Sequence, residues 1–558
     1  MDESMSFLPQ GSTEFERGTL LGRIPGGLAL IFFLAPALGA LAWFPNFVTQ
    51  DGPAHLYNAR ILNASLRPDS PFGGTFEVAW SPLPNWAGHL LTMVLVGRVR
   101  PDIAGRLITA FTLVALAGSI VWLRWVVKGS RGLATTALLA VILSLNVTWL
   151  LGFTSFLLGS ALLPLTLGVW WGGRERFGPI RALVISVLLV LGYFCHPISL
   201  ALTVAGLVLL AVGTPALDWP RRAAWTIVSL LPLAPLGLSY LALTRSAGGM
   251  APSWQFLTIP GSLLSWKNQI GWIDPITLAS RSCLPFVEGG SPGFWIMAPA
   301  LWVLVALGIL VGPSWKQGRS DHRGWLILAA ILLVGGLFGP DSLGIKHGHY
   351  LPQRVALLGV IALVPWLEFE ANRRVGRVAL GLLLGAWGMQ SLFVWDYGAD
   401  CQKVVGEIAQ AGPSIGDRHR VGTLMVGIKR RFRSNPLLHA DCLLGLQADN
   451  VIWNNYETSH YYFPVKVRPG LESPPALDFE HIVLLDAPDE MDERVERWKL
   501  LLAEYSRSID VIMVWSESPI PRLDAVNAAN GYREIFHDGS IRVWSRSEEV
   551  ASRPKGHQ

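Results

Sequence analysis

An acid and a histidine stand about one helical turn apart, directly after the first long apolar stretch of the chain. The segment FPNFVTQDGPAHLYNARILNASL contains Asp51, His55, Tyr57 and Asn58. One interpretation is structural, because Asp is a favoured helix cap and Pro53 suits the first turn of a helix. The other is chemical: Asp51 and His55 are four positions apart and can face the same side, where an acid could remove a proton or bind a metal ion. Tyr57 and Asn58 then add polar groups for a substrate.

A second polar group lies in the segment GPDSLGIKHGHYLPQR, between two apolar stretches. It contains Lys346, His347, His349 and Arg354. Arg gives paired hydrogen bonds to phosphate and Lys gives a point charge, so these residues predict a site for the phosphate of a lipid. The simpler interpretation is a solvated loop that contacts anionic headgroups. Two His at alternate positions do not by themselves indicate a metal site.

Two further residues are candidates for substrate binding. His196, in YFCHPISL, ends one apolar stretch just before Pro197; it either contacts a substrate or caps the helix C-terminus, where the helix dipole favours it. Trp272 lies among charged residues in the loop 244–292. Aromatic rings between polar groups suit stacking on a sugar, and they suit the membrane interface equally well.

The composition of the chain is typical of an integral membrane protein. Of its 558 residues, 51% are hydrophobic and 15% are charged, whereas a soluble protein carries roughly 25% charged residues. The mean hydropathy is +0.40, and the 24 Trp residues fit a membrane interface. The net charge of +5 gives no reason to expect nucleic acid, because Lys and Arg fall mainly in short loops between apolar stretches.

About eleven apolar stretches are candidate spans, since crossing the hydrocarbon core takes roughly 17–25 residues. They are 24–44, 103–123, 132–150, 153–172, 181–195, 197–213, 223–243, 293–311, 324–338, 354–367 and 378–395. The segment 84–97 is also apolar. Counting it as a span would break the alternation of charged and uncharged loops, so we expect it to be an interfacial helix.

Basic residues gather in every second short loop, and by the positive-inside rule these loops are cytoplasmic. They are Arg124, Lys128, Arg131, Arg174, Arg176, Arg181, Arg221, Arg222, Lys316, Arg319, Arg323, Arg373, Arg374 and Arg377. We therefore expect a cytoplasmic tail (1–22), a transmembrane domain (23–396) with a large first outer loop (45–102), and an extracytoplasmic domain (397–558). The membrane would be a bacterial-type inner or plasma membrane.

The segment 397–558 has the composition of a soluble protein. RVGTLMVG, HIVLLDAP and IDVIMVW are typical of strands, DEMDERVERWKLLLAEY is typical of a helix, and Asp538-Gly539 predicts a hairpin. This alternation predicts an α/β layer. WNNYETSHYYFP (453–464) is polar and aromatic and is a candidate acceptor surface, although ordinary turns look alike. Whether Cys401 and Cys442 form a disulfide is left open.

An acid a few positions after the first span, followed by a long outer loop with an amphipathic helix, resembles the GT-C class of membrane glycosyltransferases. The resemblance covers the layout of most of the chain, and QDGPAHLYNA is its sharpest local motif. It implies an enzyme that moves a hexosyl or pentosyl group from a polyprenyl-phosphate-linked donor to a glycan, lipid or protein acceptor. The class uses its first-loop acid as base or metal ligand, which maps to Asp51, so a divalent ion such as Mg²⁺ or Mn²⁺ is a candidate cofactor.

One feature of the chain departs from that class, and other functions stay open. Many members carry a second acid in the outer turn between the third and fourth spans, where this chain reads NVTWLLGFTSF. Asp102, Asp274, Glu288 or Asp341 could replace it, and metal-independent chemistry is equally open.

The alternative function is a transporter or flippase of a lipid-linked substrate, which needs charged groups at mid-membrane and often broken helices or a repeat. A non-catalytic receptor or assembly subunit is a third.

Overall fold

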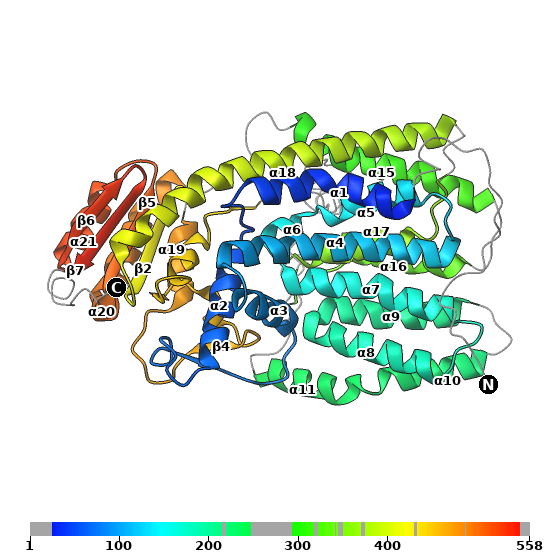
Figure 1. Cartoon of the computed structure of the whole chain (residues 1–558), viewed down its shortest axis with the longest axis horizontal. Helices are drawn as coiled ribbons and strands as arrows, with labels where there is room; N and C mark the ends of the chain where they lie inside the picture. The colour runs from blue at the N-terminus through cyan, green and yellow to red at the C-terminus, as the bar shows by residue number, and fades with distance from the viewer. Residues whose placement is uncertain are drawn as a thin grey trace, which may run out of the picture. The chain divides into compact units, whose positions relative to one another are not determined.

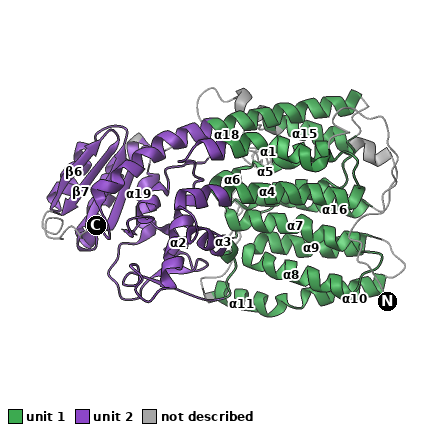
Figure 2. Cartoon of the chain, viewed as in Figure 1, with its two compact units in different colours: residues 1–39, 82–87, 109–395 green, residues 40–81, 88–108, 396–558 purple. Residues whose placement is uncertain are grey.

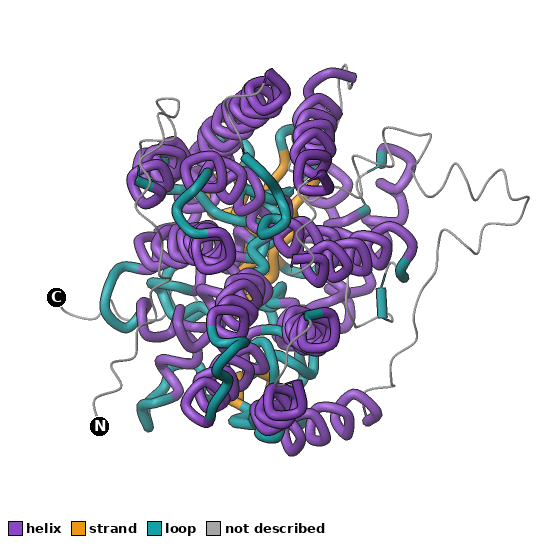
Figure 3. Tube along the Cα trace, turned by 90° about the vertical axis from the view of Figure 1, so that its right-hand side faces the viewer, coloured by secondary structure: helices purple, strands orange, loops and turns teal. Residues whose placement is uncertain are grey.

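The chain is mainly helical, as Figure 3 shows. The computed structural model describes residues 25–214, 219–246, 293–316, 322–340, 342–343, 350–369, 374–428, 432, 434–485 and 487–546. It divides into two compact units, coloured separately in Figure 2. Unit 1 comprises residues 1–39, 82–87 and 109–395, and unit 2 comprises residues 40–81, 88–108 and 396–558. Most of the first loop therefore belongs to the same unit as the C-terminal segment.

Long apolar helices build unit 1 and run roughly side by side (Figure 1). Apart from the first residues of α3, described below, the described helices wholly or partly in this unit are α1 (Gly26–Trp43), α4 (Pro101–Lys128), α5 (Leu133–Ser144), α6 (Val147–Leu151), α7 (Thr154–Gly172), α8 (Pro179–Cys195), α9 (Pro197–Gly213), α10 (Trp219–Leu230), α11 (Leu233–Ser246), α15 (Gly293–Lys316), α16 (Arg323–Phe338), α17 (Leu351–Leu363) and α18 (Arg374–Ile415). Helix α7 packs on α8 and α9, and α16 packs on α17.

Four of the described helices are long and apolar enough to cross a membrane, namely α1, α4, α7 and α18. Helices α10 and α11 are together long and apolar enough for a fifth span, although they are bent by 48° at a short break between them. Pro232 lies in this break, and proline cannot continue the hydrogen bonding of a helix. The other predicted stretches form shorter apolar helices. The chain is an integral membrane protein, while the number of eleven spans stays a prediction.

Unit 2 combines the first loop with a sheet and its helices. Its elements are α2 (Gly52–Ser65), β1 (Phe76–Val78), α3 (Trp86–Val96, which begins in unit 1), β2 (Arg420–Val426), η3 (Ala440–Gly445), β3 (Val451–Ile452), η4 (Tyr456–Ser459), β4 (Val465–Val467), α19 (Ala476–Leu484), η5 (Pro488–Glu490), α20 (Met491–Tyr505), η6 (Ser506–Ser508), β5 (Val511–Ser516), α21 (Pro521–Ala529), β6 (Tyr532–Asp538) and β7 (Ile541–Arg546). Five strands form a sheet of order β3-β2-β5-β7-β6, and β1 pairs with β4.

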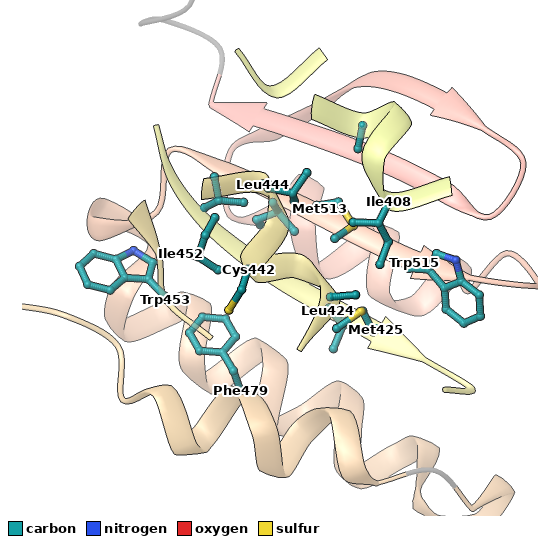
Figure 4. Close-up of a cluster of buried hydrophobic side chains, with 14 of the residues drawn as sticks. Ile408, Leu424, Met425, Cys442, Leu444, Ile452, Trp453, Phe479, Met513 and Trp515 are labelled. Atoms are coloured by element: carbon teal, nitrogen blue, oxygen red, sulfur yellow. The ribbon is translucent and has the colours of Figure 1, made fainter. Parts of the chain in front are cut away.

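The middle of the five-stranded sheet is buried, which explains its continuous apolar runs. Strand β2 pairs in parallel with β5, and β5 pairs antiparallel with β7. All six residues of β5 are buried, as expected for a strand that is covered on both faces. Figure 4 shows Leu424 and Met425 beside Met513 and Trp515, with Phe479 of α19 on one side. The strands β6 and β7 form the expected hairpin, with Gly539 at φ 54° in its turn.

The first loop contributes to the same core. Ala54, Leu56, Tyr57 and Ile61 of α2 lie in one buried apolar cluster with residues of β2 and β5. Strand β1 of the first loop pairs antiparallel with β4, opposite residues Phe76 and Val467. Helix α2 and strand β1 of the first loop are thus both packed against the C-terminal segment of the chain.

One expectation needs correction at the level of elements. HIVLLDAP was expected to form a strand, but residues 476–484 form helix α19. The reason is the spacing of its buried residues Ala476, Phe479, Ile482 and Val483, which places them on one helical face. Helix α18 runs without interruption from Arg374 to Ile415, and the boundary between the two units lies within it, between Trp395 and Asp396.

The thiols of the C-terminal segment are not joined. Cys401 and Cys442 are both buried free cysteines in the described structure. The Cys401 thiol donates a hydrogen bond to the backbone oxygen of Val48, at 3.7 Å.

Candidate functional site

Asp51 stands where a helix cap would stand, directly before α2. Its backbone lies at φ −90° and ψ −7°, and Pro53 follows in the first turn. Within the part of the chain that the structure describes, however, the Asp51 side chain makes no capping hydrogen bond. The carboxylate is therefore not engaged in the structural role that the sequence left open for it.

The Asp51 carboxylate is buried beside a histidine of the C-terminal segment. The residue is 8% exposed, and its Oδ1 lies 3.7 Å from Nε2 of His439. Burial raises the pKa of Asp51 to about 7, His55 acts against this, and the charges of Glu457 and Glu480 add to it. A carboxyl group with such a pKa exchanges a proton readily near neutral pH, which suits a general base.

His439 itself is neutral at physiological pH. It is buried, and burial lowers its pKa to about 3 although Glu457 acts in the opposite direction. Its ring stacks on Tyr456, with centroids 4.4 Å apart and planes at 22°. The stacking fixes the imidazole plane, so its Nε2 is held toward Asp51.

A second group of ligand-type side chains lies one turn further along α2. His55 of α2, His89 of α3 and Glu457 of η4 come together from three separate segments. His55 Nδ1 contacts one oxygen of the Glu457 carboxylate, and His89 Nε2 lies 2.7 Å from the other. One ligand atom of each residue lies within 4.8 Å of the others, so this group could hold a metal ion. It does not include Asp51.

Glu457 is a fully buried carboxylate. Its side chain is 0% exposed, His89 is 2% exposed and His55 is 15% exposed. Burial works to raise the pKa of Glu457, but His89 and His55 outweigh it through charge and hydrogen bonds, so the pKa is lowered. The carboxylate is therefore ionised at neutral pH, and its charge needs compensation from the groups around it.

Aromatic rings line this part of unit 2. The Phe463 ring lies 5.3 Å from that of His89 and 6.2 Å from that of His55. Tyr456 contacts Phe463 edge to face, with centroids 6.0 Å apart. These rings lie in or beside the segment 453–464, whose composition suggested a candidate acceptor surface. They lower the local dielectric around the two histidines and the acid, which strengthens electrostatic interactions there.

Tyr57 and Asn58, expected to contact a substrate, are fully buried in the core of unit 2. The Tyr57 hydroxyl donates to the backbone oxygen of Asn450 (2.8 Å) and accepts from the backbone N–H of Ile452 (3.1 Å). The side-chain amides of Asn58 and Asn455 exchange two hydrogen bonds, of 2.8 and 3.0 Å. These contacts position α2, and the role of Tyr57 and Asn58 in substrate binding stays a prediction.

His196 and Arg354, which the sequence placed in separate groups, are partners in unit 1. Nη1 of Arg354 lies 2.8 Å from Nε2 of His196. The guanidinium carbon lies 4.5 Å from the centroid of Phe153 and 5.1 Å from that of Phe156, which is the geometry of a cation–π contact. His196 Nδ1 also accepts from the backbone N–H of Ile198 at 3.2 Å, so His196 caps the start of α9.

The remaining candidates lie outside the described residues. They are Lys346, His347 and His349 of the predicted phosphate site, and Trp272 of the predicted sugar contact. Conversely, sequence reasoning did not single out His89, His439 or Glu457. His89 stands in the segment 84–97, whose apolar character hid it, and Glu457 stands in WNNYETSHYYFP among other polar residues. Only the folded chain places these residues beside Asp51 and His55.

Comparisons with known proteins find similarity among solved structures. No family model matches the chain, and no curated protein matches it. The chain is similar to the arabinofuranosyltransferase AftD from Mycobacteria, at 13% identity and a TM-score of 0.49, over 93% of this chain and 40% of that one. It therefore spans less than half the length of the AftD chain.

The chain is also similar to two structures of ArnT from Cupriavidus metallidurans. For ArnT bound to undecaprenyl phosphate the identity is 15% and the TM-score 0.45, over 95% of this chain and 99% of that one. For the apo state the identity is 15% and the TM-score 0.42, over 93% and 98%.

Proposed function

We propose that this chain is a membrane glycosyltransferase that moves a sugar from a polyprenyl-phosphate-linked donor to an acceptor outside the cytoplasm. The observation that carries the proposal is the state of Asp51. It stands directly after the first apolar helix, it is buried, and in the described structure it makes no capping hydrogen bond. A buried carboxylate that does not cap its helix is costly to keep, and buried groups with a shifted pKa are characteristic of functional sites.

In the proposed reaction Asp51 is the general base. It takes the proton of an acceptor hydroxyl while that oxygen forms a bond to the anomeric carbon of the sugar. The bond between the anomeric carbon and the phosphate oxygen breaks, and the lipid phosphate leaves with the electron pair. A raised pKa supports this role, because a base whose pKa lies near the working pH is both unprotonated and strong enough to accept the proton. His439 and His55 are the neighbours that position and tune the carboxylate.

A separate part of the proposal concerns the donor. Arg354 offers a planar cation that can form two parallel hydrogen bonds to a phosphate, and its contacts with Phe153 and Phe156 hold the plane in place. It would stabilise the charge that grows on the leaving phosphate. Lys346, His347 and His349 are proposed to assist, on the basis of the sequence alone. The N-terminus is proposed to be cytoplasmic, so that this chemistry takes place on the outer side.

The test is sugar transfer by the purified chain in lipid nanodiscs, with a panel of polyprenyl-phosphate sugars. Asp51→Asn keeps the size of the side chain but cannot accept a proton at neutral pH. We expect its transfer rate to fall by about 100-fold or more, the lower range for loss of a general base. His537→Asn, a surface change in β6, is the matched control. Equal rates in Asp51→Asn and wild type would reject Asp51 as the base.

The transporter or flippase would be recognised by a different result. A transporter or flippase would move the lipid-linked donor across a vesicle membrane without transferring the sugar. Asp51→Asn would leave the rate of this movement unchanged. The break between α10 and α11 is the feature of the described helices that most resembles a transporter, because broken helices often carry the substrate site. It consists of Leu231 and Pro232, which offer no ionisable side chain. We therefore rank the transferase first.

A further inference from the structure

We propose that His55, His89 and Glu457 form a zinc site that joins α2, α3 and η4. The three side chains come from segments far apart in the chain and meet with two imidazole nitrogens facing one carboxylate. Two imidazoles and a carboxylate are a ligand set that zinc proteins use when the ion keeps an open position. This proposal does not depend on the transfer reaction.

The geometry suits a single small ion. One ligand atom from each residue lies within 4.8 Å of the other two. Zinc bonds are about 2.0–2.2 Å long, so ligand atoms on one tetrahedral zinc lie roughly 3.3–3.6 Å apart. The imidazole rings of His55 and His89 are nearly perpendicular, at 78°, with centroids 5.0 Å apart. Small side-chain movements, without a change of backbone, would therefore bring all three atoms to bonding distance.

The charge of the surroundings favours a cation. The Glu457 carboxyl group is 0% exposed, and its two oxygens face the ring nitrogens of His55 and His89. Glu457 and Glu480 both act electrostatically on Asp51, which shows that three acids share this region. Lys466 is near enough to interact with Glu457, but its ammonium donates to the backbone oxygen of His460. A divalent ion between His55, His89 and Glu457 would compensate the buried charge directly.

The residue types favour zinc over the hard cations. Imidazole is a good ligand for Zn²⁺, whereas Mg²⁺ and Ca²⁺ are bound mainly by oxygen. His89 and Glu457 are buried, while His55 is 15% exposed. The open coordination position would thus be on the His55 side. The Mg²⁺ or Mn²⁺ ion considered from the sequence would have used Asp51, which is not a member of this group.

The expected effect of the ion is to fix α2. His55 lies in α2, one turn after Asp51 at its N-cap. The ion would tie that turn to α3 and to the C-terminal segment, in addition to the hydrogen bonds of Tyr57 and Asn58. Ligands in this site would be positioning residues for Asp51, which itself does not touch the ion.

The experiment measures metal in the full chain in nanodiscs. The protein is stripped with EDTA, exchanged into chelator-free buffer, loaded with Zn²⁺, and analysed for bound metal and for thermal unfolding. We expect one zinc per chain and a higher Tm after loading. His89→Asn and Glu457→Gln should each weaken zinc binding by at least about 100-fold, since they remove a direct ligand. His537→Asn should bind as wild type does.

A second measurement on the wild type guards against variants that fail to fold. X-ray absorption at the zinc edge should show nitrogen and oxygen ligands, with the scattering pattern of two imidazoles and no sulfur. Sulfur ligation would place the ion elsewhere and overturn the proposal. So would a wild type that binds no zinc, a Tm that rises with Mg²⁺ but not with Zn²⁺, or zinc binding that survives both His89→Asn and Glu457→Gln in folded protein.

Discussion

The carboxylate of Asp51 lies 3.7 Å from the Nε2 atom of His439, although one residue follows the first helix and the other lies in the C-terminal segment. Both groups are buried, and burial shifts both toward the neutral form, raising the pKa of Asp51 and lowering that of His439. The distance is too long for a hydrogen bond. It is short enough that a small side-chain movement would allow a hydrogen bond between the two groups. A bound hydroxyl group could also form hydrogen bonds to both of them.

His439→Asn should therefore impair turnover more than binding. Asn cannot stack on Tyr456 as imidazole does, so Asp51 loses a neighbour that limits its position. We expect kcat for sugar transfer to fall by about tenfold to 100-fold while KM for the donor changes by less than about twofold, since misplacement of a catalytic group costs rates of this order. The measurement is steady-state transfer in nanodiscs at saturating acceptor.

His537→Asn is the matched control for this change, because it removes an exposed imidazole from β6 of the same unit. An unchanged kcat in a folded His439→Asn protein would show that the ring is only a packing partner of Tyr456. A change in the donor KM alone would contradict its assignment to the base and place it with the donor instead.

Arg354 provides a prediction about the phosphate. Arg354→Lys keeps the charge but loses the flat guanidinium that lies against Phe153 and Phe156, and Arg354→Gln loses both. A charge-assisted hydrogen bond contributes about 1.5–3 kcal/mol, so Arg354→Gln should raise the donor KM by roughly 10-fold to 150-fold. The donor KM of Arg354→Lys should lie between that of the wild type and that of Arg354→Gln. Competition by free polyprenyl phosphate against labelled donor measures the same interaction without turnover.

The control for Arg354 is Arg176→Gln, an exposed arginine in the loop between α7 and α8. It should leave the donor KM unchanged. If Arg354→Gln loses affinity for polyprenyl phosphate no more than Arg176→Gln does, the phosphate site lies elsewhere, and the cation–π contacts of Arg354 are purely structural.

Local patterns in the sequence predicted local structure well. The apolar stretches lie on helices, the charged run 489–505 forms η5 and α20, and Asp538-Gly539 forms the turn between β6 and β7. HIVLLDAP was expected to be a strand, but its first half is the end of α19, because a short apolar run fits a buried strand and a buried helix equally well. Only the preceding Ala476 and Phe479 complete its helical face.

The site was predictable in part, for a physical reason. Asp51 and His55 could be found because both stand on one helix and four positions fix their relative direction. His89, His439 and Glu457 could not, since they reach α2 only through the packing of α2 against the C-terminal segment, and no periodicity reports such long-range contacts. The hydrogen bonds of Tyr57 could not be predicted either, because its partners are backbone groups of Asn450 and Ile452, which carry no signal in the sequence.

Asp441 gives a prediction of how stability depends on pH. It is fully buried, accepts a hydrogen bond from Thr423, and has a pKa raised by burial from 3.8 to about 6. The folded protein therefore binds this proton more tightly than the unfolded chain does. The stability of unit 2 should fall as the pH rises from about 4 to about 6, by an amount on the order of 3 kcal/mol, and the loss should persist above that window.

Asp441→Asn removes the titrating group and keeps an oxygen for Thr423. Between pH 4 and pH 6 the Tm of Asp441→Asn should therefore rise relative to that of the wild type. Above pH 7 the difference between the two Tm values should stay constant. Tryptophan fluorescence during heating can follow this, because Trp453 and Trp515 are buried near the sheet. A difference that does not vary with pH would contradict the raised pKa.

Tyr57→Phe separates the two roles considered for this residue. The hydroxyl is bonded to two buried backbone groups, of Asn450 and Ile452, and Phe would leave both without that partner. An unsatisfied buried group costs about 1–3 kcal/mol, and 1 kcal/mol corresponds to roughly 2–4 °C in a unit of this size. We therefore expect a Tm several degrees lower, with KM for donor and acceptor unchanged at a temperature where the protein is folded.

The opposite result would support the prediction from sequence that Tyr57 contacts a substrate. If Tyr57→Phe left the Tm unchanged and raised the KM of the donor or acceptor, the hydroxyl would be serving a substrate and not the junction between α2 and β3. Gly445→Ala is a second probe of that junction, because a Cβ at Gly445 would lie 2.3 Å from the Tyr57 ring and 2.9 Å from the Asn450 oxygen. It should destabilise the protein at least as much as Tyr57→Phe, since ring and backbone oxygen would both have to move. Agreement between the two variants would establish that Tyr57 acts by holding α2, and with it Asp51, against the C-terminal segment.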